Sequence, residues 1–358
     1  MKITYIVNQI TQLGGIERVI SMLSNYFTKE YDYDVRIVSL NTKKTDKDGF
    51  EFNPKVAIEH CGYSADEYIN RRLLNKRIRE ILKDEEARKT DIIIACHGNI
   101  ADLIALNKKL FSGKIIFTEH ASWEYYTKAR KLAQILFYRK ADKLVVLTEA
   151  AAAIYRKYGL KNVVVIPNAV RELPKFKDSG HKTHELVAIG RLEEVKGYDN
   201  LIRAVSLIKD KLEDWKITIY GSGSLEEELK RQIKAFSLED YIKMAGPTNE
   251  ALEKLHDAAG YLLTSKSEAF PMVVLESLAC GTPVVSYAFP AIKEMNGNGA
   301  ILEVEPRDDY DAFSKAILRL IGDAELRKTL SRRSLEAAKK YDISKIAAEW
   351  KKLFEDKN

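Results

Sequence analysis

Short apolar runs alternate with longer segments of helical periodicity along the whole chain, and the alternation occurs twice. Uninterrupted runs of Val, Ile and Leu indicate strands that are buried on both faces, as in a parallel sheet covered by helices. In the first half the predicted strands are ITYIV (3–7), VRIVSL (35–40), DIIIAC (91–96), KIIFT (114–118), KLVVLT (143–148) and NVVVIP (162–167). In the second half they are ELVAIGR (185–191), WKITIYG (215–221), YIKMAG (241–246), GYLLTS (260–265), TPVVSY (282–287) and GAILEV (299–304).

The segments between these strands are long enough for crossover helices. In the first half the predicted helices span 15–30, 66–89, 99–110, 122–140 and 149–158, and the chain ends in helices at 308–320, 323–339 and 343–355. Ser344 is a weak cap for the last helix, which carries an apolar stripe from Ile346 to Phe354. A polar segment at 168–184 without usable periodicity joins the halves. The pattern predicts two doubly wound α/β domains.

Composition narrows the class of protein. The length of 358 residues suits two domains, and 46% hydrophobic and 31% charged residues exclude a disordered or fibrous chain. No window approaches 18 consecutive apolar residues and the start lacks the features of a signal peptide, so we expect neither a transmembrane helix nor export. Cys61, Cys96 and Cys280 have no CxxC spacing, which favours reduced thiols in a cytoplasmic protein over a disulfide framework or a zinc site.

Positive charge is concentrated in the first half. Residues 1–172 hold 29 Lys and Arg against 21 Asp and Glu, a net +8, so the total of +6 leaves −2 for the remainder. The segment 123–140 mixes aromatic residues with five cations and could lie on an anionic membrane as an amphipathic helix. Its alternative is a crossover helix with a basic outer face. No cations interleave with aromatic residues as in a nucleic-acid module, so we expect no nucleic acid partner.

The segment SEAFPMVVLESLACGTPVV (267–285) is the strongest local motif. Pro271 precedes an apolar helix that contains Glu276, and a carboxylate in such surroundings needs hydrogen-bond donors, which a vicinal diol such as a ribose supplies. The helix start offers the free N–H groups of Met272 and Val273 to an anion or to sugar hydroxyls. Alternatively, Glu276 pairs with an internal cation and Glu268 is a capping acid.

The segment AIGRLEEVKGYDNLIRAV (188–205) places two cations after a buried strand. Ligands of open α/β sheets bind at the carboxyl ends of strands, where Arg191 and Lys196 could hold a diphosphate. The alternative is a pair of surface salt bridges with Glu193 and Glu194.

The segment NQITQLGGIERVISML (8–23) places Gly14 and Gly15 at a strand-to-helix turn, where a backbone can approach a ligand closely. The fingerprint GxGxxG and the phosphate loop are both missing, and a plain structural turn would look the same. His97 and His120 follow two strands of the first half, at the sheet edge where such folds carry out chemistry, although a loop histidine is often only solvated.

Two further patterns favour structural roles. The DxD pairs Asp32/Asp34, Asp46/Asp48 and Asp309/Asp311 are better explained as turn and capping acids than as ligands of a metal–diphosphate. No histidine has metal-ligand spacing, so we expect no metal. In GSGSLEEEL (221–229) Ser224 and Glu227 have the spacing of a capping box.

With these motifs in this order, the chain resembles glycosyltransferase family 4, whose members are retaining enzymes of GT-B architecture. The resemblance covers essentially the whole chain and is most specific at Glu268-AFPMVVL-Glu276 and Arg191…Lys196. It implies an α/β fold of two facing Rossmann-like domains with a terminal helix that crosses back to the first. Residues 1–168 with about 342–358 would bind the acceptor, and residues 169–341 the nucleotide-sugar donor.

The resemblance also implies residue roles. Arg191 and Lys196 would hold the donor diphosphate, Glu276 the ribose diol and Glu268 the hydroxyls of the transferred sugar, while His120 would touch that sugar near its reacting carbon. The other residues implied in donor binding are Gly15, Met244, Gly246, Phe270, Met272 and Val273, and those on the acceptor side are Gly14 and His97.

The implied reaction is metal-independent hexosyl transfer with retention, from a nucleotide sugar, UDP-linked by expectation, to a saccharide or lipid-linked saccharide. The leaving diphosphate oxygen would help deprotonate the acceptor hydroxyl, and the site would stabilise negative charge. Surface polysaccharide assembly at the inner face of the cytoplasmic membrane is the expected setting. The alternatives are a nucleotide-sugar epimerase or a phosphorylase on the same fold, or a protein that binds nucleotide sugars without catalysis.

Overall fold

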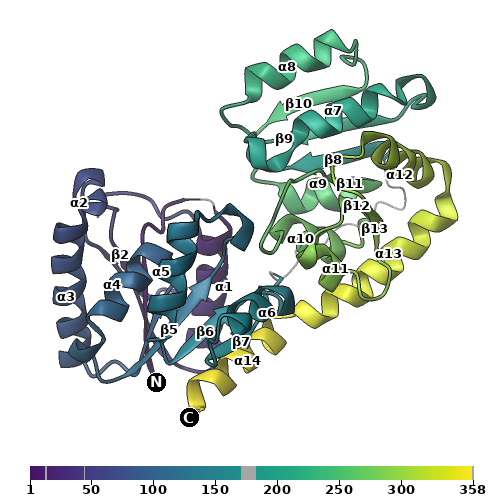
Figure 1. Ribbon diagram of the computed structural model, residues 1–358. Coiled ribbons are helices and arrows are strands. Elements are labelled where there is room, and N and C mark those ends of the chain that lie inside the picture. The colour runs from purple at the N-terminus through teal and green to yellow at the C-terminus, as the bar shows by residue number, and fades with distance from the viewer. Residues whose placement is uncertain (13, 44, 171–182, 357–358) are drawn as a thin grey trace. The chain divides into compact units, whose positions relative to one another are not determined.

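The computed structural model describes residues 1–12, 14–43, 45–170 and 183–356, and divides into two compact units (Figure 1). Unit 1 comprises Met1–Ala169 with Ile343–Asn358, and unit 2 comprises Val170–Asp342. Most of the predicted join at 168–184 lies outside the described residues. In the part of the chain that is described, no helix combines the length and the hydropathy needed to cross a membrane.

The sheet of unit 1 is entirely parallel, with strand order β3-β2-β1-β4-β5-β6-β7. Its strands are β1 (Lys2–Val7), β2 (Asp34–Ser39), β3 (Ala57–His60), β4 (Ile92–Ala95), β5 (Lys114–Glu119), β6 (Lys143–Val146) and β7 (Val163–Val165). Each predicted strand is confirmed within a few residues. The edge strand β3 was not predicted, because AIEH alternates exposed and half-buried positions and carries two polar side chains.

The helices of unit 1 are more interrupted than their periodicity indicates. They are α1 (Gly15–Glu30), α2 (Ala65–Ile69), α3 (Arg71–Ala87), α4 (Gly98–Leu106), α5 (Lys128–Tyr138), α6 (Glu149–Lys157) and α14 (Ile343–Glu355). The predicted helix 66–89 is broken at Asn70, whose side chain accepts hydrogen bonds from the backbone N–H groups of Arg72 (3.1 Å) and Leu73 (3.3 Å). The predicted helix 122–140 shortens to α5, because the side chain of Thr127 caps a new start there.

The C-terminal helix returns to the first domain, as predicted. In α14 the apolar stripe packs against α1, where the ring centroids of Phe27 and Phe354 lie 5.4 Å apart. The helix begins at Ile343, so Ser344 lies inside its first turn and the prediction of a Ser344 cap is wrong.

Unit 2 repeats the architecture with a parallel sheet of strand order β10-β9-β8-β11-β12-β13. Its strands are β8 (Glu185–Ile189), β9 (Lys216–Tyr220), β10 (Ile242–Gly246), β11 (Gly260–Leu263), β12 (Val284–Tyr287) and β13 (Ile301–Val304). Its helices are α7 (Tyr198–Ser206), α8 (Glu226–Ala235), α9 (Ala251–Asp257), α10 (Met272–Ala279), α11 (Pro290–Met295), α12 (Tyr310–Gly322) and α13 (Ala324–Ala338).

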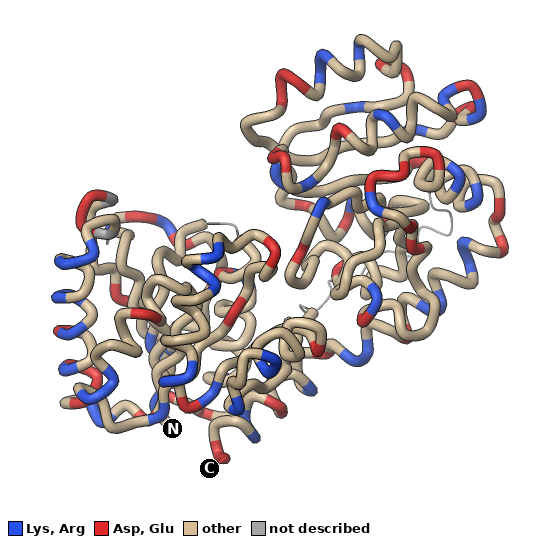
Figure 2. The backbone as a smooth tube through the Cα atoms, in the orientation of Figure 1, with Lys and Arg blue, Asp and Glu red and all other residues tan. Residues whose placement is uncertain are grey.

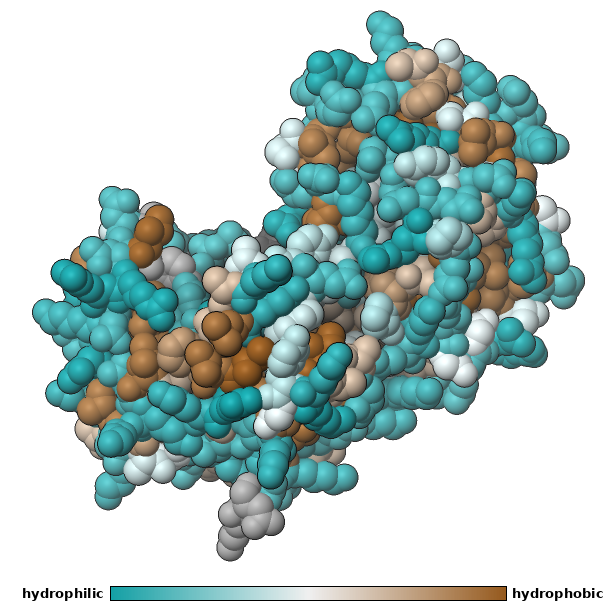
Figure 3. All heavy atoms as spheres, viewed as in Figure 1, coloured by the Kyte–Doolittle hydropathy of each residue, from teal (hydrophilic) through white to brown (hydrophobic). Residues whose placement is uncertain are grey.

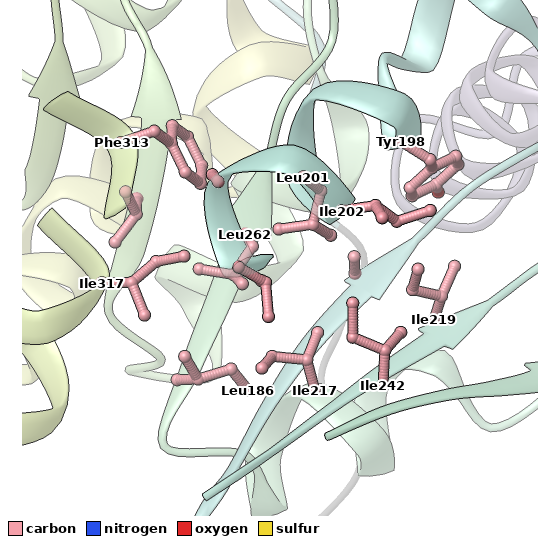
Figure 4. Packing of buried hydrophobic residues seen from close by; sticks show 14 of the residues in the cluster. Leu186, Tyr198, Leu201, Ile202, Ile217, Ile219, Ile242, Leu262, Phe313 and Ile317 are labelled. Atoms are coloured by element: carbon pink, nitrogen blue, oxygen red, sulfur yellow. The ribbon is translucent and has the colours of Figure 1, made fainter. Parts of the chain in front are cut away.

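The core of unit 2 lies between its sheet and the helices α7 and α12. Leu186, Ile217 and Ile242 come from three neighbouring strands, and they meet Leu201 of α7 and Ile317 of α12 in one buried cluster (Figure 4). Burying each such side chain stabilises the fold by about 1.5–3 kcal/mol. This core fixes the strand ends on which the loops of the candidate site stand.

The predicted capping box at the start of α8 is wrong. Leu225 occupies the N-cap position without a side-chain bond. Ser224 instead donates from its backbone N–H and its hydroxyl to the carboxylate of Glu193, at 3.2 and 2.9 Å. The tertiary contact therefore replaces the local one and ties the loop after β9 to the loop after β8.

Candidate functional site

The carboxyl ends of four neighbouring strands in unit 2 form one connected edge. The Gly221 N–H donates to the Gly246 carbonyl (2.8 Å), which joins the loops after β9 and β10. The Leu192 N–H donates to the Ser222 carbonyl (2.9 Å), which joins the loops after β8 and β9. Similarly, the loops after β8 and β11 meet through the Lys266 N–H and the Val195 carbonyl. Ligands of open α/β sheets bind at this kind of edge.

Lys196 and Glu268 form the centre of this edge. The Lys196 Nζ lies 2.5 Å from the Glu268 Oε1, and the Ser265 hydroxyl donates to the same oxygen at 2.8 Å. Both charged side chains are about one-fifth exposed, at 21% and 17%. A shielded pair with some access to solvent can exchange its internal contact for contacts with an anion and with hydroxyl groups.

Two glycines shape the approach to Lys196. Gly197 has a left-handed φ of +63°, and a Cβ there would lie 2.2 Å from the Thr264 carbonyl oxygen. At Gly190 a Cβ would lie 3.0 Å from the Tyr198 hydroxyl and 3.5 Å from the Lys196 Cε. The turn from β8 to α7 therefore depends on glycine at Gly197, where a Cβ would meet the backbone of the neighbouring loop, whereas a Cβ at Gly190 would be tight only against the Tyr198 hydroxyl.

Glu276 lies on α10 and is wholly buried, as its apolar neighbours predict. The charges of Glu268 and Glu276 both act on Tyr261 of β11, where burial, before any charge, raises the pKa of the phenol. Both carboxylates therefore belong to the surroundings of one tyrosine. The structure brings the two predicted acids of this motif into the same part of unit 2.

The start of α10 is where the sequence predicts it. Met272 is the first helical residue after Pro271, and Met272 and Val273 are half-buried. Phe270 is buried, and its ring packs edge-on against Tyr341 with centroids 5.6 Å apart. Phe270 therefore anchors the loop before α10 in the interior of unit 2.

Arg191 is exposed directly after β8 and lies near Glu193. The pKa of Glu193 is lowered, first by its hydrogen bonds from Ser224 and last by the charge of Arg191. The alternative in which Arg191 and Lys196 form salt bridges with Glu193 and Glu194 is not realised among the described residues, because Lys196 pairs with Glu268 and Glu194 with Lys266.

The carboxyl edge of unit 1 carries the two predicted histidines. Asn8 follows β1 and donates its backbone N–H to the His97 Nδ1 at 3.4 Å, while the His120 Nε2 lies 3.0 Å from the Thr118 hydroxyl. Burial lowers the pKa of each imidazole to about 4, and the charge of His97 contributes at His120. Both rings are therefore neutral near pH 7, when they can donate and accept hydrogen bonds.

At the turn before α1, the space beside Gly14 is occupied by the carboxylate of Glu17, a residue that sequence analysis missed. A Cβ at Gly14 would lie 2.2 Å from the Oε2 of Glu17, which is only 5% exposed. Burial raises the pKa of this carboxyl, and no cation within the described ranges forms an ion pair with it. The burial of Glu17 could have been predicted from the sequence, because Glu17 shares the face of α1 that carries Ile20, Ser24 and Phe27.

Glu119 is a second missed residue, and it fixes the loop that carries His120. Its Oε1 accepts hydrogen bonds from the Ala121 N–H (2.9 Å) and the Tyr126 hydroxyl (2.8 Å). Its Oε2 accepts from the Gln134 amide (2.6 Å) and the Tyr138 hydroxyl (2.9 Å). Burial raises the pKa of Glu119 although these donors oppose the shift. Glu119 is a positioning residue, since it ties the end of β5 to α5.

No cluster of three His, Cys, Asp or Glu side chains suited to a metal ion occurs among the described residues. In two DxD pairs an aspartate bonds a nearby backbone N–H: Asp309 caps α12 through Ala312 (2.8 Å), and Asp46 accepts from Lys43 (2.7 Å). Cys96 and Cys280 are buried, and Cys61 is half-buried and unbonded to another cysteine.

Comparison with known proteins adds the family. The model "Glycosyltransferase Family 4" matches residues 13–172, and the model "Glycosyl transferases group 1" matches residues 170–337. An uncharacterized glycosyltransferase of Haemophilus influenzae is 30% identical, with 98% of this chain and 99% of that protein covered. The amylovoran biosynthesis glycosyltransferase AmsD of Erwinia amylovora is 25% identical, with 98% of each chain covered.

Two further matches have informative names. The GalNAc-alpha-(1->4)-GalNAc-alpha-(1->3)-diNAcBac-PP-undecaprenol alpha-1,4-N-acetyl-D-galactosaminyltransferase of Campylobacter jejuni is 26% identical, with 99% of this chain and 98% of that protein covered. Among solved structures, S. aureus TarM in complex with fondaparinux, alpha-GlcNAc-glycerol and UDP aligns with a TM-score of 0.78 at 16% identity, covering 99% of this chain and 100% of TarM. The fold prediction is confirmed, with two Rossmann-like domains of the GT-B class.

Proposed function

The chain belongs to glycosyltransferase family 4, and we propose that it transfers a hexosyl group from a nucleotide sugar to a saccharide or lipid-linked saccharide, with retention and without a metal. The observation that carries the donor proposal is the Lys196–Glu268 pair at the carboxyl edge of unit 2. UDP is the proposed nucleotide, since the related fold of TarM was solved with UDP.

In this proposal unit 2 binds the donor. Lys196 and Arg191 hold the diphosphate, Glu276 accepts hydrogen bonds from the ribose diol, and Glu268 accepts from hydroxyls of the transferred sugar. The N–H groups of Met272 and Val273 at the start of α10 bind the same sugar or the β-phosphate. The base lies at the end of β10, at Met244 and Gly246, where the glycine leaves open space because no atom lies within 4 Å of its missing Cβ.

Unit 1 supplies the remaining groups. Gly15 brings the backbone of the first turn close to the diphosphate, and neutral His120 hydrogen-bonds the transferred sugar near its reacting carbon. Gly14 and His97 lie on the acceptor side. Neutral imidazoles suit hydroxyl groups, since they donate and accept without a charge that must be balanced.

The proposed chemistry conserves atoms and charge. The bond from the anomeric carbon to the diphosphate oxygen breaks, and the acceptor oxygen bonds to the same face of that carbon. The acceptor proton passes to the leaving diphosphate oxygen. Lys196 and Arg191 stabilise the negative charge that develops there, a contribution of about 3–4 kcal/mol for one well-placed donor.

The proposed acceptor is a saccharide carried by a lipid, in the assembly of a surface polysaccharide at the inner face of the cytoplasmic membrane. The support is the naming of the relatives, one for amylovoran biosynthesis and one for transfer to a diphospho-undecaprenol saccharide. The excess of cations in residues 1–172 agrees with an acceptor that carries phosphate.

A thermal-shift screen over nucleoside diphosphates and nucleotide sugars tests the donor. UDP and one UDP-sugar should raise the melting temperature, and the shift should survive a chelator. If only another nucleotide stabilised the chain, that nucleotide would take the place of UDP in the proposal. If no nucleotide stabilised the chain, the proposal would be contradicted. Conversion of the donor without an acceptor would indicate an epimerase. A requirement for inorganic phosphate would indicate a phosphorylase, and binding without turnover would indicate a non-catalytic protein.

A further inference from the structure

The two ring nitrogens of His120 lie in different surroundings. The Nε2 lies 3.0 Å from the hydroxyl oxygen of Thr118, which is only 6% exposed. Within the ranges that the structure describes, the Nδ1 has no hydrogen bond from the protein, and the residue as a whole is half-buried just after β5. The Nδ1 is therefore the nitrogen that remains for a ligand.

The Thr118 hydroxyl has a second buried neighbour, the thiol of Cys96. Cys96 directly follows β4, which pairs in parallel with β5, and its thiol is within hydrogen-bonding range of the Thr118 hydroxyl. Burial raises the pKa of this thiol to about 12, so the sulfur keeps its proton, and Glu17 acts on it through charge alone. The side chains of Cys96, Thr118 and His120 therefore form one hydrogen-bonded chain from the interior to the edge of the sheet.

A largely apolar cavity borders His120. Its lining includes Val19 of α1, Val145 of β6 and Trp350 of α14. In the described part of the chain, no Lys, Arg, Asp or Glu lines this cavity. The surface is different, since Lys and Arg recur along α3 (Figure 2) and hydrophilic residues cover most of the face drawn in Figure 3. The hydrogen bond between Thr118 and His120 is therefore shielded from ions and from most of the solvent.

The strengths of the acceptors fix the direction of this chain of hydrogen bonds. The Thr118 hydroxyl has one hydrogen, which an imidazole nitrogen accepts well and a sulfur atom accepts only weakly. The hydroxyl therefore donates to the Nε2 of His120, and its oxygen accepts from the Cys96 thiol. The opposite direction would leave the hydroxyl with the weaker acceptor. Because the Nε2 accepts, the proton of the neutral ring is on the Nδ1.

His97 provides a comparison at the same edge of the sheet. Its Nδ1 lies 3.4 Å from the backbone nitrogen of Asn8, and the N–H group there can only donate. The Nδ1 of His97 therefore accepts, and its neutral ring carries the proton on the Nε2. The two imidazoles accordingly hold opposite tautomers.

We propose that Thr118 and Cys96 are positioning residues that hold His120 as the Nδ1–H tautomer, so that the ring presents a hydrogen-bond donor to the sugar. The oxygen that binds there must accept a hydrogen bond, so an ether oxygen suits the ring as well as a hydroxyl does. The identity of the ligand rests on the proposed function, whereas the tautomer does not.

Nitrogen NMR of the full chain with isotope-labelled histidine tests the tautomers, because the protonated and unprotonated nitrogens of a neutral imidazole have well-separated shifts. At neutral pH the parent should carry the His120 proton on Nδ1 and the His97 proton on Nε2, and His120→Gln assigns the His120 signals. Thr118→Val keeps the branched shape without the hydroxyl, so it should move the His120 proton to Nε2, the nitrogen that a free histidine side chain prefers. Thr118→Ser should retain the proton on Nδ1.

The matched control is Thr28→Val, at a buried threonine of α1, which should leave both rings as in the parent. Cys96→Ala removes only the outer donor and should shift a smaller fraction of His120 than Thr118→Val does. In sugar-transfer assays Thr118→Val should lower kcat by about five-fold, the effect of one neutral hydrogen bond, at unchanged affinity for UDP.

A parent His120 protonated on Nε2, or an unchanged tautomer in Thr118→Val, would overturn the proposal. An unchanged tautomer in Cys96→Ala would overturn the role given to the thiol. Circular dichroism shows whether each variant is folded, and the tautomer of the parent still tests the proposal if the valine variant does not fold. Sugar transfer by a chain with His120 protonated on Nε2 would refute this inference alone, whereas the proposed tautomer in a chain without transfer would refute only the proposed function.

Discussion

Both sheets are parallel, and both carry candidate site residues where their strands end. In unit 2 these side chains are charged, whereas in unit 1 they are neutral imidazoles. In unit 2 the edge holds a lysine and an acid in direct contact, Lys196 and Glu268, with a further acid at Glu276. In unit 1 the corresponding edge holds two imidazoles that burial keeps neutral, His97 and His120. An edge with a cation can balance the charge of a diphosphate, and an edge with neutral donors and acceptors suits hydroxyl groups. Under the proposed function, the edge of unit 2 would serve the donor and the edge of unit 1 the sugar hydroxyls.

The largest expected effect is at the charged edge. Lys196→Ala should lower turnover by about 10²–10³, because one donor to the leaving diphosphate is lost, which corresponds to about 3–4 kcal/mol in the barrier. Steady-state kinetics at saturating donor measures this. The control is Lys266→Ala, a lysine of the neighbouring loop that pairs with Glu194. If Lys196→Ala kept full turnover, the cation at the edge of unit 2 would have no role in turnover, and the functional contrast between the two edges would be lost.

A smaller effect is expected where unit 1 holds its histidine in place. Glu119→Gln exchanges an acceptor of four hydrogen bonds for an amide that cannot accept them all, so the free energy of unfolding should fall by about 1–3 kcal/mol. Urea unfolding measures the loss.

If Glu119 positions His120, the same variant should lower kcat at unchanged donor KM, and Glu119→Asp should restore part of kcat. An unfolding loss with unchanged kcat would reduce Glu119 to a purely structural role. A wholly unchanged variant would contradict the hydrogen-bond network itself.

A double-mutant cycle tests the first glycine turn of unit 1. Gly14→Ala should lower the free energy of unfolding by about 1–3 kcal/mol, because its Cβ enters the space of the Glu17 carboxylate. In the Glu17→Ala background the same change should cost much less, and the difference is the coupling energy. Equal costs in both backgrounds would show that Gly14 is required for another reason, such as the approach of a ligand.

The last prediction concerns pH and applies only below neutrality. The imidazoles of His97 and His120 have a pKa of about 4 in the folded chain and about 6.5 when unfolded. Between these values the unfolded chain binds protons that the folded chain does not, so stability falls as the pH drops from about 6.5 to about 4. His97→Gln with His120→Gln should flatten this part of the curve relative to the parent. An unchanged slope would show that folding does not lower the pKa of the two rings.

Much of this architecture could be predicted from sequence, because strands of a parallel sheet are almost continuously apolar. The exception was β3, whose polar alternation is typical of a sheet edge. The burial of Glu276 could be predicted because its neighbours in α10 are apolar. Glu119 was missed because its donors Gln134 and Tyr138 come from another element, and spacing along the chain does not reveal such contacts. Glu17 was missed although its position on the buried face of α1 was visible in the sequence. Ser224 was assigned to a local cap for the same reason, although its partner is Glu193 from another loop.

The most direct test of the central claim, that the acidic and cationic edge of unit 2 binds a nucleoside diphosphate, is calorimetric titration with UDP. The parent chain should bind UDP, and Glu276→Gln should bind at least about ten-fold more weakly, since a hydrogen bond to a charged group contributes about 1.5–3 kcal/mol. Glu227→Gln, at an exposed acid of α8, should bind like the parent. Equal affinity of the parent and Glu276→Gln would contradict the account.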